Sequence, residues 1–145
     1  MNDIEKLLIA NACRDLICRY AYLNDERDFD ALAKLFTPEA LFYRPSAPDI
    51  PIIGRDAILK SFKARPTDVA TFHICSDILI EVRDAEHASA RSRILLLSGN
   101  RQVAGGIPDP AGIKPPLPGT FRDELVLTAH GWKFQKRAGS LWVTA

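Results

Sequence analysis

The 145-residue sequence lacks several features that mark particular classes of protein. It has no run of about 18 apolar residues, so we expect no membrane-spanning helix and no membrane partner. It has no glycine-rich phosphate loop and no cluster of metal ligands, so we expect neither a cofactor nor a metal. The formal net charge is only +1, which leaves no basic surface for nucleic acid.

Cysteine is also scarce. Cys13, Cys18 and Cys75 are odd in number and lie inside apolar segments, which is typical of reduced core residues and not of a disulfide framework or a zinc site. The first residues lack a basic region followed by an apolar run, so they do not resemble a signal peptide. We therefore expect a cytoplasmic protein.

The composition that remains is that of an ordinary globular protein. Apolar residues make up 47% of the chain and charged residues 26%. A chain of this length can bury one full core, and no internal repeat or linker divides it. The sequence therefore predicts a single domain over residues 1–145.

A long helix is predicted over residues 3–24, because apolar residues recur on one of its faces at positions 9, 13, 16, 17 and 20. That face ends in two polar side chains, Tyr20 and Asn24, directly before Asp25. A buried stripe that ends in polar groups suggests the rim of an interior space. The alternative is a helix end that frays into solvent.

The following segments predict helices first and then strands. Asp28 is the expected N-cap of a second helix, and the residue before Pro38 ends it. The expected elements are helices over 29–36 and 54–65, a short strand over 41–43, a proline loop over 45–51, and strands over 71–82, 88–98, 120–129 and 132–138. Within 71–82, positions 72, 74, 78 and 80 should share one face, and 73, 75 and 77 the other. This order predicts an α+β fold, with three N-terminal helices packed on a curved, mostly antiparallel sheet.

The connection 99–118 is long for neighbouring strands and contains four glycines and five prolines. Ile107, Ile113 and Leu117 are apolar residues that an exposed loop would not need. We expect this segment to be a lid over a cavity or an arm that packs on a second subunit. A disordered insertion is the remaining alternative.

The chain resembles the SnoaL-like group of the nuclear transport factor two-like superfamily, which has an α+β cone fold around a cavity. The resemblance covers nearly the whole chain and is carried by Tyr20-Ala21, Asp25 to Ala40, Gly54 to Ile58, Thr71-Phe72-His73, Ala88 to Arg91, Asp123 to Leu125 and Gly131 to Phe134. It implies the fold but no single reaction, since this fold includes dehydratases, isomerases, cyclases, dehydrochlorinases and non-enzymatic binding proteins.

The resemblance also implies site residues. Asp25 and His73 match the aspartate–histidine pair of scytalone dehydratase and of hexachlorocyclohexane dehydrochlorinase. Tyr43 matches a second site tyrosine of the dehydratase, whereas Asn24 stands where that enzyme has a tyrosine directly before the aspartate. A second site histidine and a cationic residue of these enzymes have no counterpart, so neither specific activity is carried over.

The chemistry of such a pair can be stated without the family. A carboxylate bonded to one imidazole nitrogen fixes the tautomer and raises the basicity of the other nitrogen. In an apolar cavity the pair could remove a proton from carbon, and hydroxyl groups could donate to the oxygen that gains charge. We therefore take Asp25 and His73 as candidate catalytic residues, and Tyr20, Asn24 and Tyr43 as candidate substrate-binding residues. A purely structural strand histidine is the alternative for His73.

Two classes of function remain open. The first is a cofactor-independent, dehydratase-like lyase or isomerase that acts on a small hydrophobic, cyclic molecule. The second is a non-catalytic small-molecule binding or assembly domain, or an accessory subunit resembling the small subunit of ring-hydroxylating dioxygenases. The run Ile94 to Leu97 is apolar on both faces of its strand, so we expect a homodimer or larger homo-oligomer formed through the outer face of the sheet.

Overall fold

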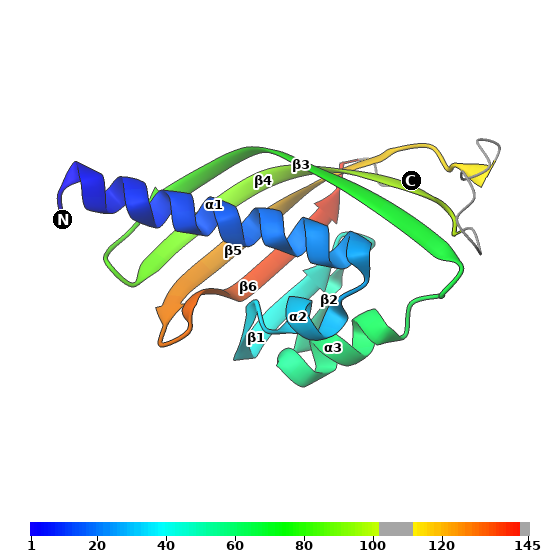
Figure 1. Cartoon of the computed structure of the whole chain (residues 1–145), viewed down its shortest axis with the longest axis horizontal. Helices are drawn as coiled ribbons and strands as arrows, with labels where there is room; N and C mark the ends of the chain where they lie inside the picture. The colour runs from blue at the N-terminus through cyan, green and yellow to red at the C-terminus, as the bar shows by residue number, and fades with distance from the viewer. Residues whose placement is uncertain (102–111, 143–145) are drawn as a thin grey trace.

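The computed structural model describes residues 1–101 and 112–142. Within these ranges, three helices pack on one six-stranded mixed sheet, with strand order β2-β1-β6-β5-β4-β3 (Figure 1). The elements are α1 (Asp3–Glu26), α2 (Phe29–Ala33), β1 (Phe36–Arg44), β2 (Ala47–Ile53), α3 (Arg55–Lys63), β3 (Val69–Val82), β4 (His87–Asn100), β5 (Leu117–Thr128) and β6 (Gly131–Leu141). The predicted α+β fold, with helices on a curved and mostly antiparallel sheet, is confirmed.

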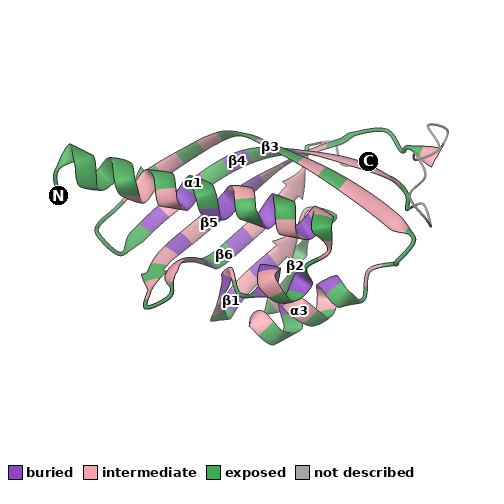
Figure 2. Cartoon of the chain, viewed as in Figure 1, coloured by how far each residue is buried: buried purple, intermediate pink, exposed green. Residues whose placement is uncertain are grey.

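The α1 helix crosses one face of the sheet (Figure 1). A capping box formed by Asn2 and Glu5 begins it, and Arg27 ends it in the left-handed conformation with φ 60°. The predicted stripe is confirmed, since its buried residues are Cys13, Leu16, Ile17, Tyr20, Ala21 and Asn24. Figure 2 shows buried bands alternating with exposed ones along α1. The stripe thus carries Asn24 to a buried position directly before Asp25.

The second helix begins as predicted but is shorter. The side chain of Asp28 accepts a hydrogen bond from the backbone N–H of Ala31 at 3.2 Å. The helix ends at Ala33 and not at residue 36, because Phe36 already pairs with Phe134 of β6 as the first residue of β1. Pairing with the sheet therefore prevails over helical periodicity in this segment.

The expected proline loop over 45–51 is wrong. Residues 47–53 form β2, which pairs antiparallel with β1 and lies at the edge of the sheet. Pro48 and Pro51 are compatible with this position, because an edge strand has backbone sites that need no N–H donor. The neighbouring β1 runs parallel to β6, which makes the sheet mixed.

A bulge divides β3 into two halves. The pairing with β4 shifts between Ser76 and Leu79, and Asp77 has a φ of 52°. An extra residue reverses which side chains face the core. Ile78 and Ile80 therefore pack against the core, whereas the sequence pattern placed them on the face of Phe72, which is exposed.

Tyr20 lies at the centre of an aromatic core. Five phenylalanine rings surround it edge-on with centroids 5.9 to 6.3 Å away; they belong to Phe36, Phe42, Phe62, Phe121 and Phe134. Edge-to-face contacts at this distance add to the stability that area burial provides. This core fixes the last turns of α1 over the sheet.

Most of the predicted lid, residues 102–111, lies outside the described residues. On its flanks, the N–H of Arg101 donates to the carbonyl of Asp68 at 2.6 Å, and the N–H of Lys114 donates to that of Ser98 at 2.9 Å. None of the described helices is both long and apolar enough to cross a membrane.

Candidate active site

Asp25 and His73 are in direct contact. His73 Nδ1 lies 2.5 Å from Asp25 Oδ1, and the backbone N–H of His73 donates to Asp25 Oδ2 at 2.8 Å. The hydroxyl of Thr71 donates to Oδ1 at 2.9 Å. The predicted contact between Asp25 and His73 is therefore confirmed, and Thr71 is a further partner that the sequence interpretation did not assign.

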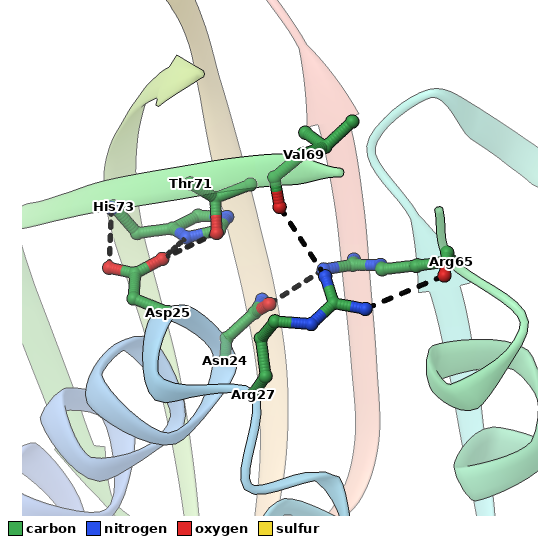
Figure 3. Close-up of polar contacts among 7 residues, drawn as sticks. All are labelled: Asn24, Asp25, Arg27, Arg65, Val69, Thr71 and His73. Atoms are coloured by element: carbon green, nitrogen blue, oxygen red, sulfur yellow. Dashed lines mark hydrogen bonds and ion pairs between the residues drawn. The ribbon is translucent and has the colours of Figure 1, made fainter. Parts of the chain in front are cut away.

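Two elements bring these groups together. Asp25 lies in the last turn of α1, and Thr71 and His73 are alternate residues of β3, so their side chains share one face of the strand (Figure 3). The side chains of His73 and Asp25 are only 10% and 21% exposed. A carboxylate with three hydrogen bonds from one strand has little freedom to rotate.

The arrangement selects one tautomer of His73. Since an ionised carboxylate only accepts hydrogen bonds, Nδ1 must carry the proton that lies between the two groups. Nε2 is then left unprotonated on the neutral ring, with a lone pair that can accept a proton. The nitrogen that points away from Asp25 in Figure 3 is therefore the basic atom of the pair.

His73 lines a cavity of about 200 Å³ between α1 and the sheet. Much of its wall is apolar and includes Phe42, Ile94, Leu96, Leu117, Phe121 and Leu141. Tyr20 and Asn24 also line it, as do Arg44 and Arg65. A volume of this size suits a small molecule, and it is below the usual range for drug-sized ligands.

The two predicted binding residues on α1 are at the cavity, but both are already engaged with arginines. The Oδ1 atom of Asn24 accepts a hydrogen bond from Arg65 at 2.6 Å (Figure 3). The guanidinium of Arg137 lies 4.3 Å from the centroid of the Tyr20 ring. Burial raises the pKa of the Tyr20 hydroxyl, and the charges of Arg137 and Arg65 oppose this rise. Tyr20 therefore remains a neutral hydroxyl donor.

Tyr43, the third candidate substrate-binding residue, is not among the residues that line this cavity. Phe42 is fully buried in the core, so the next residue of β1 faces the opposite side of the sheet. The ring of Tyr43 instead lies 5.6 Å from the ammonium of Lys136 on the neighbouring strand.

A buried ion pair next to the cavity wall was not predicted. Arg137 donates to Asp123 at 2.7 Å, and both side chains are fully buried. The guanidinium of Arg137 also stacks 3.8 Å from the centroid of the Phe121 ring. Burial raises the pKa of Asp123 to about 6, although the charge of Arg137 opposes the rise. The alternation of Phe121, Asp123 and Leu125 could have indicated that Asp123 faces inward.

The sequence model of one protein family, described as SnoaL-like domain, matches residues 5–138 of this chain. The chain belongs to the SnoaL-like domain family. A comparison with curated proteins finds no match.

Solved structures agree with this fold. A candidate scytalone dehydratase from Novosphingobium aromaticivorans is 24% identical, with a TM-score of 0.78 over 99% of this chain and 91% of that one. An NTF2-like protein with a cystatin-like fold from the same organism is 22% identical, with a TM-score of 0.76 over 98% and 87%. A hexachlorocyclohexane dehydrochlorinase (LinA, type 2) is 16% identical, with a TM-score of 0.78 over 98% and 90%. At these identities the likeness concerns the fold alone.

Proposed function

We propose that this SnoaL-like chain is a cofactor-independent lyase or isomerase, in which Asp25 and His73 remove a proton from carbon. The observation that carries the proposal is the contact of His73 Nδ1 with Asp25 at 2.5 Å, with the imidazole at the wall of a mostly apolar cavity. Removal of a proton from carbon needs a base at an apolar site, because water would otherwise compete with the weakly acidic C–H bond for that base.

The first step transfers a proton from a carbon beside a carbonyl to Nε2 of His73. The C–H electron pair moves into the carbonyl group and forms an enolate, while Asp25 stabilises the imidazolium. In a lyase, the enolate electrons re-form the carbonyl and make a C=C bond, while the hydroxyl group on the next carbon leaves with its bonding electrons and takes the proton from His73 as water. In an isomerase, His73 returns the proton to a different carbon, and the double bond moves.

Tyr20 lines the cavity, and its hydroxyl is the proposed donor to the oxygen that gains charge. Its ring is fixed by five phenylalanines, so the hydroxyl needs little rearrangement during the reaction. The apolar wall supports a small hydrophobic, cyclic substrate. Asn24 holds Arg65 by a hydrogen bond and so orders one side of the cavity.

The names of two structural neighbours support the reaction class. A dehydratase and a dehydrochlorinase both remove a small molecule from adjacent carbon atoms. These names describe those proteins. They support the proposal for this chain because His73, the proposed base, lines a cavity of the same fold.

The proposal can be tested with two probes that give one product. Elimination of water from 3-hydroxycyclohexanone and a double-bond shift in 3-cyclohexenone both yield 2-cyclohexenone, which is followed by its ultraviolet absorbance. The wild-type protein is expected to accelerate one of the two reactions. His73→Asn should reduce the rate roughly 100- to 10,000-fold, as expected for loss of a general base.

Matched variants separate chemistry from folding. Thermal unfolding of His73→Asn should remain close to that of the wild type, because its side chain lies at a cavity and not in the packed core. His87→Asn is the control, since His87 is a half-exposed histidine bonded to Asp84 on the surface. Equal rates for wild type and His73→Asn would contradict the proposal. Binding without turnover would favour a non-catalytic binding domain.

A further inference from the structure

Two arginines face the cavity beside His73 but have no role in the proton transfer. Arg44 ends β1 and Arg65 follows α3, and both line the cavity wall. Their guanidinium carbons lie 5.9 and 4.4 Å from the centroid of the Phe62 ring. Two groups that approach one ring this closely form a shared positive region at one side of the cavity.

A third arginine adds to this region. Arg27 donates to the backbone carbonyls of Arg65 and Val69, each at 3.5 Å (Figure 3). The pKa of Arg65 is lowered, first by burial and then by the charges of Arg44 and Arg27, whereas Tyr20 and Asp25 oppose the shift. The fold therefore keeps like charges together in a partly buried place, which costs free energy unless an anion is present.

Neutral oxygen atoms are the partners of both cavity arginines. Arg65 donates to the amide oxygen of Asn24 at 2.6 Å, and Arg44 donates to the backbone carbonyl of Ser61 at 2.5 Å. Within the described part of the chain, neither forms an ion pair with a carboxylate. The Nε atom of Arg44 is buried without a hydrogen-bond partner among these residues. Each guanidinium thus retains donors that a ligand could use.

The nearby carboxylate of Asp25 offsets part of this positive charge but forms no ion pair with Arg44 or Arg65 among the described residues. Asp25 accepts hydrogen bonds from Thr71, from the backbone of His73 and from its ring, so its oxygens are already engaged. Guanidinium groups bind planar oxyanions with paired hydrogen bonds, and such bonds are stronger than neutral ones. The cavity therefore combines an apolar wall, one base and two arginines whose hydrogen-bond partners are neutral.

We propose that the molecule this cavity binds carries a carboxylate, which Arg44 and Arg65 hold while its apolar ring packs on Ile94, Leu96 and Phe121. The proposal rests on the proposed function for one point only, namely that this pose presents a carbon-bound proton to His73. It restricts the substrate class to small cyclic carboxylic acids. Arg44 and Arg65 would then determine specificity and orientation.

Binding of two matched probes tests this without any turnover. Cyclohexanecarboxylate and cyclohexanecarboxamide have nearly the same shape and differ in charge. Isothermal titration calorimetry on the full chain should give a Kd for the carboxylate about tenfold or more below that for the amide. Arg65→Gln and Arg44→Gln should each weaken carboxylate binding about tenfold and leave amide binding unchanged.

Three further variants make the result specific. Arg65→Lys keeps the charge and should retain part of the preference. Arg19→Gln removes one positive charge from the exposed face of α1, where Arg19 pairs with Asp15, and should change nothing. Asp25→Asn should keep the carboxylate preference, so failure of the proton-transfer proposal would leave this one standing.

Several outcomes would overturn the inference. Equal affinity of the wild type for both probes, or binding of neither, would exclude a carboxylate site in this cavity. A preference that survives in both arginine variants and disappears in His73→Asn would assign the anion to the imidazole instead. If Arg44→Gln and Arg65→Gln weaken the binding of both probes equally, the arginines only maintain the shape of the cavity.

Discussion

His73 and Asp25 are 48 positions apart in the sequence, and Nδ1 of His73 lies 2.5 Å from Oδ1 of Asp25. The end of a helix and the first half of an edge strand supply the two groups, and Thr71 of the same strand holds the carboxylate from a second direction. This geometry leads to predictions on the base, on the core below it and on the outer face of the sheet.

Asp25→Asn should abolish turnover while the fold remains. An amide at position 25 can donate to Nδ1, which would leave the proton on Nε2, and Nε2 could then no longer accept one from substrate. We expect a loss of roughly 1,000- to 10,000-fold, by analogy with the tautomer effect known for serine protease triads. Steady-state rates with either cyclohexanone-derived probe measure it. Retained activity would place the base elsewhere.

Thr71→Val should have a smaller effect that is specific to the site. The substitution removes the 2.9 Å hydrogen bond to Asp25 but keeps the shape of the side chain and its suitability for a strand. We expect turnover to fall roughly 10- to 100-fold, since a hydrogen bond to a charged carboxylate contributes on the order of 1.5 to 3 kcal/mol. Thr71→Ser keeps the hydroxyl and should restore the rate. If the serine variant is as slow as the valine variant, Thr71 does not act through this bond.

The buried pair Asp123–Arg137 should behave as a unit. Asp123→Leu alone leaves a buried guanidinium without its carboxylate, and we expect a loss of about 3 to 5 kcal/mol in the free energy of unfolding. Asp123→Leu combined with Arg137→Met removes both charges and should recover most or all of it. Urea unfolding of the wild type, both single variants and the double variant gives the coupling. If the losses of unfolding free energy in the two single variants simply add up in the double variant, Asp123 and Arg137 do not act as a unit.

The same pair should make stability depend on pH. The pKa of Asp123 rises from 3.8 in the unfolded chain to about 6 in the folded one, because burial disfavours the charged carboxylate. The folded state therefore binds more protons between these values. The contribution of Asp123 to the free energy of unfolding is fully present below about pH 4 and is lost as pH rises through about 6. The loss is on the order of 2 to 3 kcal/mol.

Urea unfolding between pH 4 and pH 8 measures this dependence, with the double variant of Asp123 and Arg137 as control. Subtracting the control removes the titration of surface groups that both proteins share. A difference between the two proteins that stays constant with pH would show that Asp123 does not titrate in this range.

The outer face of the sheet should form a homodimer. Phe72 and Ile74 of β3 are 60% and 42% exposed, and they pair with Leu97 and Leu95 of β4 on the face opposite the cavity. Exposed apolar residues that adjoin one another favour a second copy of the chain as cover. Light scattering should give a dimer for the wild type and a monomer for Phe72→Glu. Tyr22→Glu, on the exposed side of α1, is the control. A monomeric wild type at micromolar concentration would exclude this interface.

Much of the fold was predictable because hydrophobic periodicity reports burial directly. The stripe on α1 and the cap at Asp28 follow from residue spacing alone. The β2 strand was not predictable in the same way. Its prolines are tolerated because β1 pairs with one of its edges and, among the described strands, none pairs with the other. That is a property of the whole sheet.

The site was predictable in part for a similar reason. Asp25 and His73 follow from the resemblance to the SnoaL-like group. Arg137 instead depends on an irregularity in β6, where the pairing with β5 passes from Phe134 to Lys136 and skips Gln135. Strict alternation from Phe134 would place Lys136 inward and Arg137 outward, and the extra residue reverses this. Arg44 and Arg65 each precede a proline at an element end, a position that carries no signal of cavity exposure.

Deuterium exchange tests the central claim most directly, because it requires only that a carbon-bound proton is removed. Cyclohexanone and 4-oxocyclohexanecarboxylate are incubated in D₂O with the protein, and loss of the proton signal beside the carbonyl is followed by NMR. We predict that wild type accelerates exchange of at least one ketone, and that Asp25→Asn and His73→Asn each return it to the buffer rate. Exchange by the wild type no faster than by these two variants would contradict the role of Asp25 and His73 as a base.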